Sequence, residues 1–193
     1  MLYYILKVLL YIPLQIFFPT RRIGGKIPKG KYILVCNHRS NADVIVVHNL
    51  LWCKPHILAK KELFKGVLKP IMNITGSICV DRENVSLSTI KNCLSVLKQN
   101  KKLFIFPEGT RSKDDNKEFN EIKSGVVMFA VKGQSKILPL YLKKKPKLFR
   151  FNSLVVGSPI SLEEYYGSKI TQDITDKCGD IIVKNLNEIS NKY

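Results

Sequence analysis

Two short blocks of the sequence carry side chains suited to acid–base chemistry and to anion binding. The first block, residues 37–43, contains a histidine and, five positions on, an aspartate. The second block, residues 106–112, contains a glutamate and an arginine around a glycine. Each block directly follows an apolar run typical of a buried strand, and open α/β sheets bind their ligands at the carboxyl ends of strands. The blocks therefore predict one site that combines a base, an orienting acid and an anion-binding group.

His38 and Asp43 can interact only if the chain between them turns, because residues five apart in a helix lie about 140° apart around its axis. Ser40 and Asn41 favour such a turn, and Asp43 would then begin the next helix. A carboxylate that binds one ring nitrogen fixes the tautomer and leaves the other nitrogen as a general base. The alternative is a surface histidine beside an aspartate that merely caps a helix.

The base has no obvious nucleophile of its own in the sequence. No G-x-S-x-G motif is present, and Ser40 lies only two residues from His38, a poor position for activation. We therefore expect His38 to deprotonate a bound substrate hydroxyl, with no covalent acyl-enzyme. A histidine–aspartate pair that activates water would instead give an esterase or a thioesterase.

Arginines near these blocks are candidates for binding a phosphate. Arg111 follows Gly109, which lets the backbone approach a ligand closely, and arginine binds phosphate through two parallel hydrogen bonds. Arg82 follows another strand-like run, so it is expected at the same edge of the sheet. The simpler interpretations are a surface ion pair between Glu108 and Arg111 and a solvated loop arginine at position 82.

The elements that must position these residues alternate between strand and helix patterns. This alternation predicts a single α/β domain over residues 21–193, with a mixed central sheet flanked by helices. The predicted strands are residues 32–36, 57–59, 77–80, 103–106, 137–142 and 154–156. The predicted helices are residues 43–52, 62–72 (interrupted by Gly66 and Pro70), 87–97 with Ser86 as N-cap, 124–132 and 174–189.

The first 20 residues form a separate apolar segment. Residues 1–19 are almost wholly apolar apart from Lys7 and Gln15, and Pro13 lies near the middle. A spanning helix needs about 20 apolar residues, so the segment is marginal for crossing a bilayer. Its aromatic residues and the basic residues just after it predict a membrane anchor at the cytoplasmic face of the cell membrane. The alternative is a hydrophobic helix packed on the core.

Composition limits the class of partner. Lys and Arg number 32 against 15 Asp and Glu, a formal net charge of +17. Such a charge attracts a polyanion, an anionic membrane, or an acidic protein or substrate. No pattern typical of nucleic-acid recognition accompanies it, so we expect no nucleic-acid partner. The five cysteines lack a C-x-x-C spacing, which argues against a zinc site or a disulfide and favours a reduced, cytosol-facing domain.

Four ordered blocks of the sequence resemble those of the glycerolipid acyltransferases, and the bacterial 1-acyl-sn-glycerol-3-phosphate acyltransferases match best. The resemblance covers roughly residues 30–160, and Lys123-Ser124-Gly125 also fits the family pattern. The blocks are His38-x4-Asp43, Gly76-Ser77-Ile78-Cys79-Val80-Asp81-Arg82, Phe106-Pro107-Glu108-Gly109-Thr110-Arg111-Ser112 and Ile137-Leu138-Pro139-Leu140.

The resemblance implies a role for each candidate residue. His38 would be the base and Asp43 its orienting partner, and Pro139 would lie on the side of the acyl donor. The acceptor phosphate and its surroundings would be bound by Arg82, Glu108, Gly109, Thr110 and Arg111.

The implied reaction moves a fatty acyl group onto the 2-hydroxyl of lysophosphatidic acid (1-acyl-sn-glycerol-3-phosphate), giving phosphatidic acid for phospholipid biosynthesis. The donor would be a thioester of coenzyme A or of acyl carrier protein, and no metal or bound cofactor is expected. Another lysolipid, such as a lyso-ornithine lipid, remains an alternative acceptor.

Overall fold

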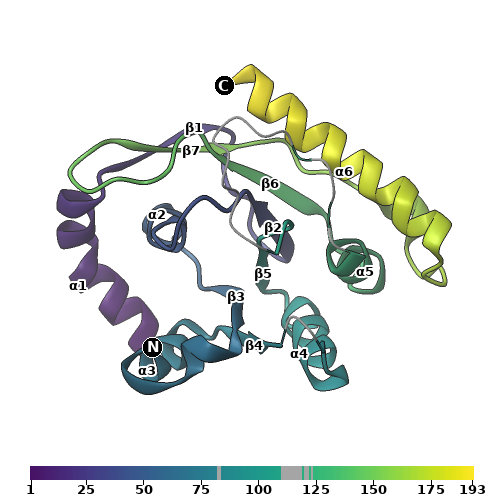
Figure 1. The fold of residues 1–193 in the computed structure, drawn as a ribbon, viewed down its shortest axis with the longest axis horizontal. Coiled ribbons are helices and arrows are strands. Elements are labelled where there is room, and N and C mark those ends of the chain that lie inside the picture. Colours follow the sequence, from purple (N-terminus) through teal and green to yellow (C-terminus); the bar gives the residue numbers. More distant parts are fainter. Residues whose placement is uncertain (82–83, 110–118, 120–121, 123) are drawn as a thin grey trace.

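A computed structural model of the chain places seven strands in one central sheet (Figure 1). It describes residues 1–81, 84–109, 119, 122 and 124–193. Across the sheet the strands follow the order β1-β7-β6-β2-β5-β3-β4. Their bounds are β1 Thr20–Gly24, β2 Tyr32–Cys36, β3 Pro55–Lys60, β4 Ile78–Val80, β5 Lys102–Ile105, β6 Ile137–Leu142 and β7 Asn152–Val156.

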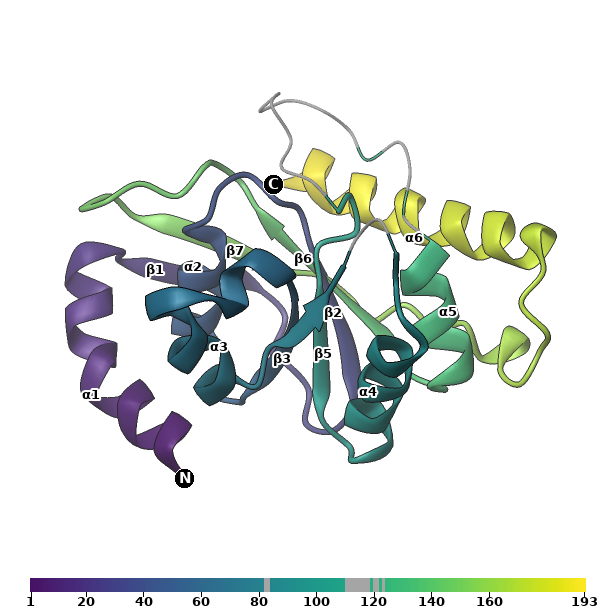
Figure 2. The same ribbon diagram turned by 60° about the horizontal axis from the view of Figure 1, so that its bottom comes forward.

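Helices cover both faces of the sheet, because successive residues of each buried strand point to opposite sides. On β2, Ile33 and Val35 belong to one core cluster, and Leu34 and Cys36 belong to the other. The first cluster packs against α4, α5 and α6, and the second packs against α2 (Figures 1 and 2). The helices are α1 Leu2–Phe17, α2 Asp43–Leu50, α3 Lys69–Thr75, α4 Leu87–Lys98, α5 Ser124–Lys132 and α6 Gln172–Lys192, with 3₁₀ turns at Lys61–Phe64, Gly66–Leu68 and Glu163–Tyr165.

The strand directions bring the two candidate blocks to one edge. Strands β6, β2, β5, β3 and β4 pair in parallel along the sheet. Among the strands formed by the described residues, β6 and β7 alone pair antiparallel, and β1 is parallel to β7, so the sheet is mixed as expected. Because β2 and β5 are neighbours and run in the same direction, the residues that follow them lie side by side. The same edge also holds the start of β1, and therefore the end of α1.

Most of the predicted elements are present, with three differences. Residues 20–24 form the edge strand β1, where no strand was predicted. The predicted interrupted helix over residues 62–72 is two 3₁₀ turns followed by α3, and Pro70 lies in the first turn of α3, where proline is tolerated. The helix that begins at Asp43 ends at Leu50, two residues earlier than predicted.

The N-terminal segment is a helix of 16 residues whose apolar side chains are largely exposed. Tyr3 is its one buried residue among those described, whereas Leu9 and Ile12 are 65% and 68% exposed. In the part of the chain that the structure describes, no helix has both the length and the apolar character needed to cross a bilayer. The helix lies along one side of the molecule, beside α2 and α3 (Figures 1 and 2).

Candidate active site

His38 and Asp43 form a buried pair at the carboxyl end of β2. The Nδ1 atom of His38 lies 2.8 Å from Oδ2 of Asp43. Asp43 is fully buried and His38 is 9% exposed, so little water competes for this interaction. An ionised carboxylate is an acceptor only, so Nδ1 carries the hydrogen and Nε2 of the neutral ring is left as an acceptor. The predicted pair is therefore present in the geometry that a general base requires.

The chain between the two residues turns around the Asp43 carboxylate. Its Oδ2 accepts hydrogen bonds from the backbone N–H of Arg39 at 2.6 Å and of Ser40 at 2.7 Å, and Ser40 Oγ lies 3.1 Å from Oδ1. Asp43 begins α2, where its charge is favourable to the helix dipole. The carboxylate therefore fixes the histidine and also the backbone that carries it.

Two further contacts hold the histidine block in place. The ring of Phe106, just after β5, stacks on His38 with 3.9 Å between ring centres and 19° between planes. Asn37 bonds both main-chain groups of Leu142 at the end of β6, donating to the carbonyl and accepting from the N–H. The block is thus supported from both neighbouring strands, β5 and β6.

Arg39 extends this support to the end of β6. Its Nε donates to the carbonyl of Leu142 at 3.0 Å, and an Nη2 hydrogen bond reaches the Tyr141 hydroxyl at 3.1 Å. The side chain is only 9% exposed, and its guanidinium also lies over the Tyr141 ring. Arg39, the residue after the base, therefore connects this block to the end of β6.

Neither Cys36 nor Ser40 is activated as a nucleophile. Burial raises the pKa of the Cys36 thiol well above its ordinary value, and the nearby carboxylates of Asp43 and Glu108 raise it further. A thiol with a raised pKa is inert at neutral pH. The Ser40 hydroxyl is taken up by the Asp43 carboxylate. The pair is therefore suited to activating a group on a bound substrate.

The second block turns directly after β5, beside the histidine. The N–H of Gly109 donates to the carbonyl of Phe106 at 3.1 Å, and Gly109 adopts φ +69°, which favours glycine. Glu108 is half-buried near Cys36. Three predicted binding residues, Arg82, Thr110 and Arg111, lie outside the described residues. Asp81, just before position 82, carries an exposed 2.5 Å ion pair with Lys61.

Pro139 lies apart from this group. It is buried in the middle of β6, opposite Val35 of β2, and its carbonyl accepts from Gly157 N–H. It is not among the described residues that line the cavity near the site. No described side chains form a cluster of three or more metal-binding groups.

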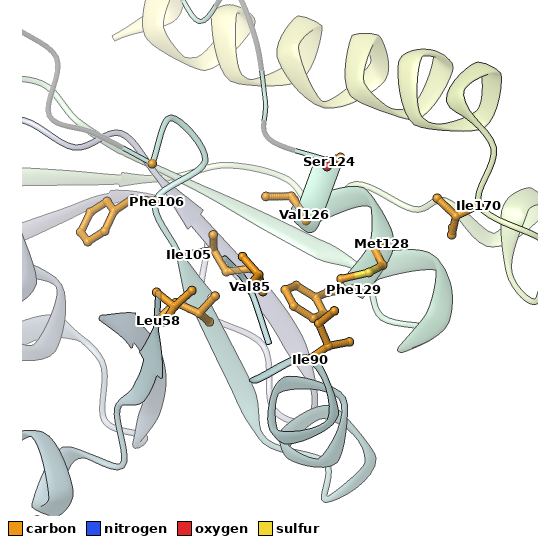
Figure 3. A pocket seen from close by; sticks show the side chains of 13 residues that line it. Leu58, Val85, Ile90, Ile105, Phe106, Ser124, Val126, Met128, Phe129 and Ile170 are labelled. Carbon is orange, nitrogen blue, oxygen red and sulfur yellow. The ribbon is translucent and has the colours of Figure 1, made fainter. Parts of the chain in front are cut away.

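An apolar cavity of about 390 Å³ lies at the end of β5. Phe106 and Gly109 contribute to its wall, so the cavity adjoins the second block, whereas His38 is not among the described residues that line it. Figure 3 shows side chains from β3, α4 and α5 arranged around the space, among them Leu58, Ile90 and Phe129. Ligand cavities of this size and apolar character accommodate hydrocarbon chains.

Asn37, Arg39 and Phe106 support the site but were not predicted to do so from the sequence. All three belong to the two blocks, so their positions were available. Their roles were not, because each depends on which strands lie next to β2, and the order of strands cannot be derived from local patterns. A polar pair flanking a histidine after a wholly buried strand was the available signal for Asn37 and Arg39.

Comparison with known proteins relates the chain to one family. The acyltransferase family matches residues 20–143. A 1-acyl-sn-glycerol-3-phosphate acyltransferase of Bacillus subtilis is 30% identical over 69% of this chain and 69% of its own length. One from Helicobacter pylori is 37% identical over 67% of this chain and 56% of its own.

The fold also matches a solved structure. A crystal structure of the 1-acyl-sn-glycerophosphate acyltransferase PlsC from Thermotoga maritima aligns with a TM-score of 0.68 at 19% identity, covering 97% of this chain and 82% of that one. The chain spans between 56% and 64% of the length of three curated relatives that it matches. Because the family matches residues 20–143 and the relative in Bacillus subtilis is 30% identical, the chain belongs to the acyltransferase family.

Proposed function

We propose that this protein transfers a fatty acyl group from a thioester to the sn-2 hydroxyl of 1-acyl-sn-glycerol-3-phosphate, giving phosphatidic acid in phospholipid biosynthesis. The buried His38–Asp43 pair is the observation that carries the proposal, because it supplies a base without an activated nucleophile beside it. The names of the relatives from Helicobacter pylori and Bacillus subtilis support this substrate.

The proposed reaction is a direct displacement. Nε2 of His38 takes the proton of the acceptor hydroxyl as its oxygen attacks the thioester carbonyl carbon. The tetrahedral intermediate collapses with loss of the C–S bond, and the departing thiolate takes the proton from the imidazolium. Asp43 stabilises that imidazolium without itself taking the proton. This chemistry needs the thioester of coenzyme A or acyl carrier protein as co-substrate, and neither a metal nor a bound cofactor.

The acceptor phosphate is assigned to the residues that follow β4 and β5. Gly109 and half-buried Glu108 lie beside the pair, which supports an acceptor site at this edge. Arg82 and Arg111 would bind the phosphate, since guanidinium groups match its geometry, and Thr110 would complete the turn. Pro139 is assigned to the donor side on resemblance alone.

The acyl chain of the donor is assigned to the cavity beside Phe106. Phe106 and Gly109 follow β5 at the edge that carries the pair and form part of the cavity wall, which supports a chain whose carbonyl end lies toward that edge. The apolar wall from α4 and α5 would replace the water around the chain, and burying each methylene contributes about 0.8 kcal/mol.

We propose that α1 lies in the cytoplasmic face of the cell membrane, where the lipid acceptor resides. An exposed apolar helix with aromatic residues is suited to the interface of a bilayer. Tyr11 packs against the ring of Trp52, which is 62% exposed, so the apolar surface continues beyond the helix. The net charge of +17 favours an anionic surface as the partner.

Removal of the base tests this mechanism. We expect His38→Ala to lower acyl transfer by about 10²- to 10⁴-fold, the usual contribution of a general base. His56→Ala is the matched control, because His56 bonds the carbonyl of Gly76 away from the pair and should leave transfer close to normal. Full activity in folded His38→Ala protein would show that the proposed mechanism is wrong.

A panel of acceptors and donors tests the substrates. Purified protein is assayed with lysophosphatidic acid, a lyso-ornithine lipid and other lysolipids, each with acyl-CoA and with acyl carrier protein thioesters. We expect lysophosphatidic acid to be the best acceptor. Equal use of acceptors that lack the phosphate monoester would contradict the roles of Arg82 and Arg111. Release of free fatty acid, without acyl transfer, would indicate a thioesterase.

A further inference from the structure

A strongly basic groove lies between the end of β6 and the start of β7. Its volume is about 640 Å³, and no carboxylate is among the described residues that line it. Six of its lining residues are basic: Arg21, Lys143, Lys144, Lys145, Lys147 and Arg150. Concentrated charge of one sign in a hollow attracts anions more strongly than the same charge spread over a surface. The proposed catalytic machinery includes none of these six side chains.

The groove has a framework that keeps its shape. The Asn152 side chain, at the start of β7, hydrogen-bonds the main chain of the loop before it. It donates to the carbonyls of Lys147 and Arg150 and accepts from the N–H of Lys147. Arg21 of β1 reaches across to Ser153 of β7, with 3.1 Å between Nε and Oγ. The basic side chains are therefore carried by a loop that is tied to the sheet.

The groove adjoins an exposed apolar surface. Leu148, Phe149 and Phe151 of the same loop are 55%, 67% and 79% exposed. Phe149 packs on Phe17 at the end of α1, with 5.4 Å between ring centres, and its N–H donates to the Phe17 carbonyl. In both overall views the loop between β6 and β7 extends toward the end of α1 (Figures 1 and 2). Basic and apolar groups thus form one continuous surface.

The groove also begins next to the candidate active site. Lys143 directly follows Leu142, whose carbonyl accepts from both Asn37 and Arg39. The loop, the end of α1 and the His38 block therefore lie at the same edge of the sheet. Whatever occupies the groove therefore lies next to the end of β6, where Asn37 and Arg39 are bonded.

We propose that this groove binds the phosphate groups of anionic phospholipids in a bilayer. The apolar side chains beside it would enter the acyl region while the lysines and arginines contact the headgroups, the arrangement of a surface-bound membrane protein. An acidic protein would match the lysines but would leave three large apolar side chains of the loop in water. The combination of the two surfaces therefore favours a membrane.

This site would orient the molecule on the bilayer. With α1 and the loop as two points of contact, the edge that carries His38 faces the lipid surface, and a lysolipid could reach the base without leaving the membrane. The inference rests on the proposed function for its purpose. Its test is independent of that function, because vesicle binding is measured without any acyl transfer.

The experiment measures binding to vesicles by co-sedimentation. The full chain is mixed with phosphatidylcholine vesicles, with and without phosphatidylglycerol, and compared with the triple variant Lys144→Gln, Lys145→Gln, Lys147→Gln. A basic side chain near an anionic surface strengthens binding about fivefold, so we expect the triple variant to bind anionic vesicles on the order of 100-fold more weakly. Binding to neutral vesicles should be unchanged. Added salt should weaken the binding of the wild-type protein to anionic vesicles and leave its binding to neutral vesicles unchanged.

The matched control removes three other exposed lysines, Lys91 and Lys98 of α4 and Lys184 of α6, which lie on the opposite face from α2. Near-normal binding of this control would support the groove, and an equal loss would show that only the total charge matters. Normal vesicle binding by the groove variant would overturn the proposal. In that case, selective loss of transfer from acyl carrier protein, with acyl-CoA unaffected, would identify a protein-docking surface instead.

Discussion

Asp43 is the residue on which the geometry around His38 depends. Its carboxylate accepts from the histidine ring and from two backbone N–H groups, all of them buried or nearly so. Hydrogen bonds to a charged group are stronger than those between neutral groups, and each contributes about 1.5–3 kcal/mol. A change at Asp43 therefore alters both the tautomer of His38 and the turn that carries His38.

We expect Asp43→Asn to lower both activity and stability. The amide has one acceptor oxygen where the carboxylate has two, and its NH₂ group would face groups that also donate. Loss of the tautomer control should reduce kcat by about 10²- to 10⁴-fold. Loss of one buried hydrogen bond should reduce the free energy of unfolding by about 1–3 kcal/mol. Steady-state kinetics and urea unfolding measure the two effects. Unchanged kcat in folded variant protein would contradict the orienting role.

The contact between α1 and α2 is a polar connection beneath an apolar helix. The Tyr3 hydroxyl lies 3.1 Å from Nδ1 of His48 and donates to the carbonyl of Cys53, and Lys7 donates to the carbonyl of His48. Tyr3 is buried and Lys7 is half-buried, and this burial raises the pKa of Tyr3 and lowers that of Lys7. The helix is therefore attached to the domain at specific points and not by apolar packing alone.

His48 should make this attachment sensitive to acid. Burial, and then the charge of Lys7, lower the pKa of His48 to about 4 in the folded protein, whereas the unfolded value is about 6.5. Between these values only the unfolded state takes up the proton, so stability falls as the pH falls from about 6.5 to 4, by up to about 3 kcal/mol. Urea unfolding at several pH values measures this. His48→Gln should be less stable at pH 7 and should lose less stability across that interval, and an identical loss would exclude His48 as the cause.

Local patterns in the sequence predicted the elements that have a full set of local signals. Ser86 accepts a hydrogen bond from the N–H of Thr89 and caps α4 as expected. Strand β2 was predicted because it is wholly apolar apart from its first residue and ends in a polar turn. The strand β1 was missed, because Arg21 and Arg22 on an exposed edge give no apolar alternation. Its pairing with β7 depends on a segment far along the chain, which no local pattern reveals.

In the candidate site, too, some contacts follow from local sequence and others depend on which strands are neighbours. The interaction of His38 with Asp43 follows from their spacing and from the turn residues between them, and the structure confirms it. The stacking of Phe106 on His38 and the bonds from Asn37 to Leu142 require β5 and β6 to flank β2. The roles of Arg82, Thr110 and Arg111 remain predictions, since these residues lie outside the described part of the chain.

Across the whole molecule, the pairing of β1 with β7 joins segments far apart in the sequence into one sheet. Gly24, the last residue of β1, has φ +85°, and a Cβ atom there would lie 2.5 Å from the carbonyl oxygen of Val156. Its neighbour Gly25 donates to that same oxygen, but a Cβ atom on Gly25 would have no contact closer than 3.7 Å. A side chain at Gly24 should therefore destabilise the fold far more than a side chain at Gly25.

We expect Gly24→Ala to lower the free energy of unfolding by about 1–3 kcal/mol, because it combines a strained backbone with a contact against the main chain. Gly25→Ala is the matched control and should change stability by less than about 0.5 kcal/mol. Urea unfolding of both variants measures the difference. Equal stability of the two variants would show that the end of β1 is not held as described.

The pairing of β1 with β7 also sets an order of events during synthesis. Thr20 of β1 lies opposite Asn152 of β7, so the strand that follows α1 has no partner until 132 further residues have been made. Contacts so distant along the chain form late in folding. During translation, α1 therefore emerges from the ribosome before the sheet that will hold it is complete. The exposed apolar side chains of α1 are available to a membrane during that interval.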